Sequence, residues 1–179
     1  ALGLAGEPVF VVGTADTQSA ISAMQAEVGE LVTVSGTTSP TLKIITDFCK
    51  YPRTWVSPTA EPGRLMLEVN TASSGINLQR FKDTMLKDMP YEHLNEDAAQ
   101  RGLPERNLPG MYAVFLTGMH LDQDLLTGGF VMSNPISVDT KPEDYFHALT
   151  LNIGMSISMC IEKMKTLQPL EHDYLIGCG

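Results

Sequence analysis

Apolar and polar residues alternate without interruption from position 149 to position 161, near the C-terminal end of the chain. Every odd position carries a large apolar side chain, and every even position carries a small or polar one. Side chains of a β-strand point to opposite faces in turn, whereas a helix would distribute these apolar residues around its axis. The pattern predicts one long strand whose buried face is made of Leu151, Ile153, Met155, Ile157 and Met159.

Shorter strands and helices are predicted along the rest of the chain. Apolar and β-branched runs bounded by turn residues predict strands at 7–13, 30–35, 41–48, 64–71, 111–118 and 130–138. Apolar spacings of three and four residues predict helices at 16–28 and 78–89, followed by a polar helical turn at 91–102. The segment 51–63 contains three prolines and is predicted to be a loop.

The order of these elements favours a mainly β fold. Strands that follow one another through turns, without a regular succession of crossover helices, are typical of antiparallel sheets. We therefore expect an antiparallel, jelly-roll-like β-sandwich with one or two short helical insertions. Residues 1–179 are expected to form a single domain, and the alanine at position 1 indicates that it was excised or trimmed from a longer chain.

Charge and composition exclude several classes of function. The chain has 21 acidic and 12 basic residues, giving a net charge of −9, and its basic residues are interleaved with acidic ones. Such a surface repels a phosphate backbone, so direct binding to nucleic acid is not expected. No apolar run is long enough to span a membrane. The three cysteines lie too far apart for a Cys-x-x-Cys site.

The search for catalytic and metal-binding motifs yields one weak cluster. No nucleophile motif and no glycine-rich phosphate loop occurs, so no catalytic residue and no organic cofactor is predicted. Asp122 and Asp124 follow the predicted strand at 111–118 and would share one face of an extended segment. Two carboxylates on one face can bind a hard cation such as calcium. The alternative is an ordinary acidic loop exposed to solvent.

Three aromatic residues are candidates for ligand binding. Trp55 lies in the middle of the proline-rich segment, and Tyr51 and Tyr112 accompany it as further aromatic side chains that could stack on a ligand. The alternative for Trp55 is that its ring plugs the edge of the core, since an exposed tryptophan without a partner is unfavourable.

The C-terminal sequence resembles that of a viral family. The tetrapeptide Met159-Cys160-Ile161-Glu162, followed by Pro169 and Tyr174, is similar to the end of the jelly-roll domain in coat proteins of the nodavirus and tetravirus group. The resemblance implies a capsid shell or protruding domain located in the virion. Its partners would be copies of itself, neighbouring capsid subunits or a ligand on the host surface. The chain lacks the arginine-rich arm of such coat proteins, as an excised outer domain or a shell trimmed of its arm would, and the acidic charge favours an outward-facing domain.

Two further functions remain open at this point. A cellular, cytoplasmic β-sandwich that binds a carbohydrate or a peptide through Trp55, Tyr51 and Tyr112 is the main alternative to the capsid domain. An enzyme is the weakest of the three hypotheses, because no motif fixes a reaction.

Overall fold

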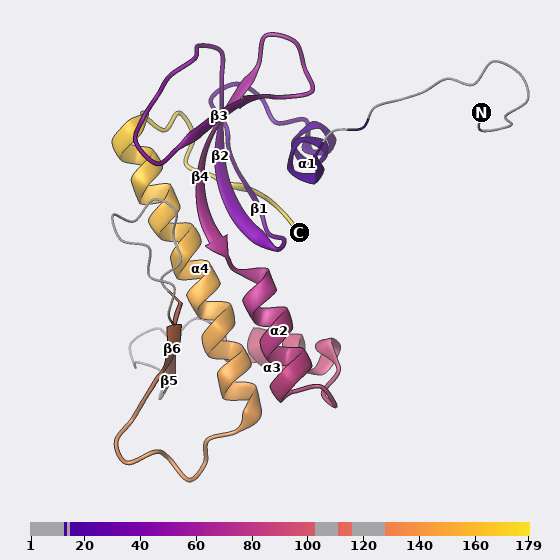
Figure 1. Ribbon diagram of the computed structural model, residues 1–179, viewed down its shortest axis with the longest axis vertical. Coiled ribbons are helices and arrows are strands. Elements are labelled where there is room, and N and C mark those ends of the chain that lie inside the picture. The colour runs from indigo at the N-terminus through magenta and orange to yellow at the C-terminus, as the bar shows by residue number, and fades with distance from the viewer. Residues whose placement is uncertain (1–12, 14, 103–110, 116–127) are drawn as a thin grey trace, which may run out of the picture.

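The computed structural model (Figure 1) describes residue 13 and residues 15–102, 111–115 and 128–179. Within these residues the helices are α1 (Asp16–Met24), α2 (Gly75–Met85), α3 (Tyr91–Arg101) and α4 (Pro142–Leu167). The strands are β1 (Leu31–Val34), β2 (Thr38–Ile45), β3 (Trp55–Pro58), β4 (Leu65–Ser73), β5 (Met111–Phe115), β6 (Gly128–Met132) and β7 (Ile176–Cys178).

Five of the strands form one mixed sheet in the order β3-β4-β2-β1-β7. The β1–β2, β2–β4 and β3–β4 pairs are antiparallel, whereas β7 pairs with β1 in parallel. The parallel pair joins segments from opposite ends of the chain, with Val32 opposite Ile176 and Val34 opposite Cys178. The C-terminal residues therefore lie beside the first hairpin (Figure 1).

A helix covers each face of this sheet. The short helix α1 packs on one face, and the long helix α4 packs on the other (Figure 1). The α1 side buries Ile21, Ala26, Val32, Leu42, Ile44 and Met66. The α4 side buries Leu31, Ile45, Leu67, Val69, Cys160 and Met164. Alternating positions of the strands serve the two faces, as the pleat of a sheet requires.

The segment predicted to be a long strand is a helix, and this prediction was wrong. Residues 149–161 lie inside the 26-residue helix α4. Burial along this segment follows the helical period: Leu149, Cys160 and Met164 are buried, whereas Met155 and Met159 are exposed. Five of the seven alternating apolar residues are buried or half-buried, and two methionines are exposed.

The residues before the alternating segment explain why the helix forms. Pro142 occupies the first turn, where its missing N–H is not needed and its fixed φ favours the helix. The carboxylate of Asp144 accepts a hydrogen bond from the backbone N–H of Lys141 at 2.7 Å and so caps the helix. Glu143 and Asp144 also place negative charge at the positive end of the helix dipole.

The remaining elements pack around the first half of α4. The β5–β6 hairpin forms a separate two-stranded sheet that packs on α4 together with α2. Phe81 of α2, Phe130 of β6 and Tyr145 of α4 form an aromatic cluster, with ring centroids 5.0–5.9 Å apart. Helix α3 lies against the start of α4 through Leu94 and Phe146.

The architecture is mixed α/β, so the predicted jelly-roll-like sandwich is wrong. Several local predictions are nevertheless confirmed in large part: the strands at 30–35, 41–48 and 64–71, and helices that overlap 16–28, 78–89 and 91–102. The segment 51–63 contains the short edge strand β3 and is not wholly a loop. The predicted strand at 7–13 lies outside the described residues, apart from Gly13.

The two strands of the β5–β6 hairpin were both predicted, and positions 116–118 of the first prediction lie outside the described residues. The prediction at 111–118 is confirmed over Met111–Phe115, and the prediction at 130–138 is confirmed only to Met132. Among the described helices, none combines the length and the apolar character needed to cross a membrane.

Candidate functional site

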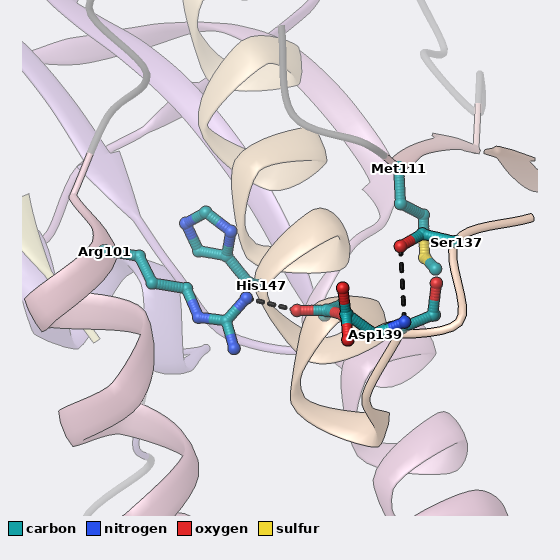
Figure 2. A pocket seen from close by; sticks show the side chains of 7 residues that line it. Arg101, Met111, Ser137, Asp139 and His147 are labelled. Atoms are coloured by element: carbon teal, nitrogen blue, oxygen red, sulfur yellow. Dashed lines mark hydrogen bonds and ion pairs between the residues drawn. The ribbon is translucent and has the colours of Figure 1, made fainter. Parts of the chain in front are cut away.

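A cavity of about 350 Å³ lies between the end of α3 and the start of α4. It is lined by Arg101, Met111, Ser137, Asp139, Thr140, Asp144 and His147. Figure 2 shows Arg101 and His147 on one side of this space, with Met111 and Ser137 on the other. The lining residues come from α3, β5, the β6–α4 loop and α4, so the cavity depends on the packing of all four segments.

Arg101 pairs with two carboxylates beside this cavity. Its Nε lies 2.7 Å from Oδ2 of Asp97 on the same helix, and its Nη1 pairs with Oδ1 of Asp144 on α4. Burial raises the pKa of Asp144, whereas hydrogen bonds from the Lys141 N–H and from Arg101 lower it. The lowering is the larger effect, so the pKa of Asp144 lies below its ordinary value. Asp144 is therefore ionised at neutral pH and holds α4 against α3.

The other polar groups of the cavity keep hydrogen-bonding capacity. His147 Nε2 lies 3.2 Å from the carbonyl oxygen of Gly102, which can only accept, so Nε2 donates and Nδ1 of the neutral ring is an acceptor. Ser137 accepts a hydrogen bond from the N–H of Asp139, and its O–H remains a donor. Met111 is buried and supplies an apolar wall.

A second polar feature is the turn between β1 and β2. Ser35, Gly36 and Thr37 are exposed there, and all three have small side chains. The N–H of Ser35 donates to the carbonyl of Cys178 at 2.7 Å, and the N–H of Gly36 donates to the carbonyl of Thr38 at 2.9 Å. The C-terminal strand therefore holds the turn in place from one side.

Helix α2 holds the same turn from the other side. The carbonyl of Thr37 accepts hydrogen bonds from the N–H groups of Ser74 and Ile76 at 3.3 and 3.1 Å. The hydroxyl groups of Ser39 and Ser74 lie 2.7 Å apart in the interior. A side chain at Gly75 would overlap the carbonyl oxygen of Gly36, so this contact requires glycine.

The aromatic residues singled out in the sequence do not come together. Trp55 lies on the edge strand β3 and is 42% exposed, whereas Tyr112 lies on β5 of the other sheet. Tyr51 packs with the α4-side core, and its hydroxyl accepts a hydrogen bond from Gln168 at 2.9 Å. Ligand binding by Trp55, Tyr51 or Tyr112 stays a prediction.

The proposed calcium ligands Asp122 and Asp124 lie outside the described residues. Within the described part of the chain, no group of three or more histidine, cysteine, aspartate or glutamate residues is placed to hold a metal ion. The structure brings Arg101 together with Asp144 and His147, and Arg101 lies 43 residues before Asp144, so no motif could reveal this group. The turn at 35–37 was visible only as a polar hairpin loop.

Comparison with known proteins identifies the fold. The chain is 28% identical over 181 residues to a Bacillus subtilis protein described as "Putative sugar kinase YoaC", an alignment that covers 99% of this chain and 36% of the relative. Glycerol kinase of Plasmodium falciparum, solved with ADP, superimposes with a TM-score of 0.69 at 15% identity, over 92% of this chain and 33% of that one. The chain therefore shares the fold of about a third of this glycerol kinase.

Xylulose kinases share this fold. The enzyme of Bifidobacterium adolescentis superimposes with a TM-score of 0.65 at 16% identity, over 92% of this chain and 31% of that one. The Rhodospirillum rubrum enzyme gives a TM-score of 0.64 at 16% identity, over 83% and 30%. The chain thus spans about a third of the length of the proteins it matches. No protein-family model matches it.

These similarities overturn the viral interpretation. The kinase match extends over almost the whole chain, whereas the coat-protein resemblance rested on a few residues after position 158. Those residues lie at the end of α4 and in the segment after it, not on the last strand of a jelly roll. The expectations of capsid assembly, of capsid or host-surface partners and of location in the virion are therefore wrong, and so is the alternative of a β-sandwich binding module.

Proposed function

We propose that the protein containing this chain is a carbohydrate kinase of the FGGY family, which transfers a phosphoryl group from ATP to a hydroxyl group of a small sugar or polyol. The sequence similarity to a putative sugar kinase over 99% of the chain is the observation that carries this proposal. The fold shared with xylulose and glycerol kinases supports it independently.

The β1–β2 turn is the part of this chain best suited to approach the nucleotide phosphates. Turns of small residues present backbone N–H groups and hydroxyls, which bind phosphate oxygens. Ser35, Gly36 and Thr37 are exposed and carry no bulky side chain. The first turn of α2 is anchored on Thr37, so the positive end of this helix dipole points at the turn and favours an anionic ligand.

Gly36 supports the placement of a ligand at the turn, because neither the backbone conformation nor the packing of the fold requires glycine at this position. Its φ is not in the left-handed region, and a Cβ there would approach only the carbonyl oxygen of Thr38, at 3.8 Å. A glycine with no steric role inside the chain is expected where a ligand comes close to the backbone.

In the proposed reaction the hydroxyl oxygen of the sugar attacks the γ-phosphorus of ATP. The bond from that phosphorus to the bridging oxygen of ADP breaks, and the hydroxyl proton passes to a base. Phosphoryl transfer depends on positioning and on neutralising the charge of the phosphate oxygens. The N–H groups of Ser35 and Gly36 already donate within the chain, so the hydroxyl groups of Ser35 and Thr37 would donate hydrogen bonds to those oxygens.

The test is release of ADP from ATP by the full-length protein, in a coupled assay with a panel of sugars and polyols that includes xylulose, glycerol and gluconate. We expect ADP release with at least one of them, well above the rate without a sugar. The Gly36→Val variant should raise the KM for ATP at least tenfold without lowering Tm. Failure to bind ATP, or the absence of sugar-dependent ADP release across the panel, would refute the proposal.

A further inference from the structure

The cavity between α3 and α4 is separate from the β1–β2 turn. None of the residues that line the cavity belongs to the turn or to the start of α2, which holds the turn. The cavity lies at the first two turns of α4, whereas the start of α2 faces the middle of α4 near Asn152 and Ser156. The nucleotide role proposed for the turn leaves this cavity without a function.

We infer that the α3–α4 cavity binds a small, neutral, polyhydroxylated molecule, a free monosaccharide or a polyol. Its volume of about 350 Å³ is in the range of small-molecule sites. The inference gives this cavity a ligand of its own and does not depend on where the phosphoryl acceptor binds.

The hydrogen-bonding groups of the cavity match a molecule that carries several hydroxyls. Asp139 offers carboxylate oxygens, His147 offers Nδ1, and Ser137 and Thr140 offer hydroxyl groups that can donate or accept. Arg101 makes three hydrogen-bonded or ionic contacts with Asp97 and Asp144, which leaves part of its five-donor guanidinium for a ligand. A hydroxyl group both donates and accepts, so a polyol can satisfy donors and acceptors in one site.

Charge argues against a phosphorylated or carboxylated ligand. Asp97, Asp139 and Asp144 contribute three negative charges around the cavity, and Arg101 and Lys141 contribute two positive ones. Both nearby cations interact with Asp144, and Arg101 also pairs with Asp97. The carboxylate of Asp139 has no ion-pair partner among the described residues. An anionic ligand in the cavity would therefore be repelled by the negative charge of Asp139.

The apolar wall suits a ring or a carbon chain. Met111 is 5% exposed and borders the cavity, and the core behind it contains Ala148 and Leu149. A sugar ring presents C–H groups on its faces and hydroxyls around its edge. One face can therefore lie on Met111, while hydroxyls at the edge reach Asp139 on the same side of the cavity and His147 on the opposite side (Figure 2).

The test is direct binding to the full-length protein without nucleotide, by calorimetry and ligand-observed NMR. The panel contains neutral monosaccharides and polyols together with their monophosphates. We expect at least one neutral member to bind and its monophosphate to bind at least tenfold more weakly. Asp139→Asn and Thr140→Val should each raise Kd at least fivefold, whereas Asp173→Asn, the same chemical change at an exposed site elsewhere, should leave Kd unchanged.

Three results would overturn the inference: no neutral member binds, the monophosphate binds better, or Asp139→Asn and Thr140→Val leave Kd unchanged. The last result would place the ligand in another site, such as that of the phosphoryl acceptor. Because the assay uses no ATP and measures no turnover, its failure is distinct from failure of the kinase proposal.

Discussion

Lys43 and Glu171, which are 128 residues apart, form an ion pair at the edge of the core. The Nζ of Lys43 lies 2.9 Å from Oε1 of Glu171 and donates to the carbonyl of Pro169 at 2.6 Å. The lysine side chain is 2% exposed and the glutamate side chain 54%. Lys43 lies on the central strand β2, so its contacts hold the segment between α4 and β7 against the middle of the sheet.

The Lys43–Glu171 pair predicts a loss of stability in acid. The hydrogen bond from Lys43 and its positive charge hold the pKa of Glu171 below the ordinary value of 4.5. A carboxylate whose pKa is lower in the folded state stabilises the fold above its unfolded pKa, and this contribution disappears as the pH falls through the folded value. Glu171→Gln should therefore lower Tm at pH 7, and the difference from wild type should shrink below about pH 4.

The matched control is Asp173→Asn, since this exposed carboxylate lies two residues further along the same segment. Its Tm should follow that of wild type at each pH. A difference between wild type and Glu171→Gln that stays constant from pH 7 to pH 3 would contradict the assignment.

The two faces of α4 can be distinguished with one type of substitution. Met164 is 0% exposed, and Met155 is 61% exposed. Met164→Ala should lower the free energy of unfolding by about 2–5 kcal/mol, because it empties space in the core. Met155→Ala should change it by less than about 0.5 kcal/mol. Urea denaturation of both variants measures these changes. Equal losses of unfolding free energy would contradict the helical burial pattern, in which Met155 is exposed and Met164 is buried.

Helix α4 also marks the limit of what the sequence could predict. The strands β1 and β2 are rich in β-branched residues, β4 contains Leu65, Met66, Leu67 and Val69, and all three lie near turn residues, so local pattern and tertiary structure agree. In 149–161 the small polar residues fall on even positions, and a period of two fits them better than a period of 3.6. The signals that decide for a helix are Pro142 and Asp144, which lie before this segment and cap it.

The candidate sites were less predictable than the fold, for a physical reason. Arg101 and Asp144 are 43 residues apart and meet only because α3 packs on α4. The turn at 35–37 depends on Cys178 and Ser74, which approach it from distant parts of the chain. Sequence spacing carries no information about such contacts, so only the turn itself could be located.

Alanine should destabilise the fold at only one of two glycines that lie in contact, Gly75 and Gly36. A methyl group at Gly75 would overlap the carbonyl oxygen of Gly36 and lie 3.0 Å from its carbonyl carbon, and both atoms belong to the backbone. Gly75→Ala should destabilise the fold by about 1–3 kcal/mol, since the turn must shift. Gly36→Ala should change stability by less than about 0.5 kcal/mol. Thermal denaturation tests the pair, and similar Tm values for both variants would show that the contact is loose.

Arg101 is expected to be the residue that fixes α3 against α4. Lysine in its place keeps the charge but cannot bind both carboxylates through a planar fork, so Arg101→Lys should cost about 1–2 kcal/mol of unfolding free energy. Arg101→Met should cost more, because Asp97 and Asp144 would then face each other's negative charge without the guanidinium.

The pH dependence separates this ion-pair role from simple packing. The pKa of Asp144 is lowered in the fold, so its contribution is present above the ordinary value of 3.8 and is lost as the pH falls further. The stability difference between wild type and Arg101→Met should therefore narrow in urea titrations below about pH 4. Lys165→Met serves as the control, because Lys165 forms an exposed pair with Glu162 and such pairs contribute less than about 1 kcal/mol. If Arg101→Met is no more destabilising than Lys165→Met, the Arg101 network does not hold the two helices together.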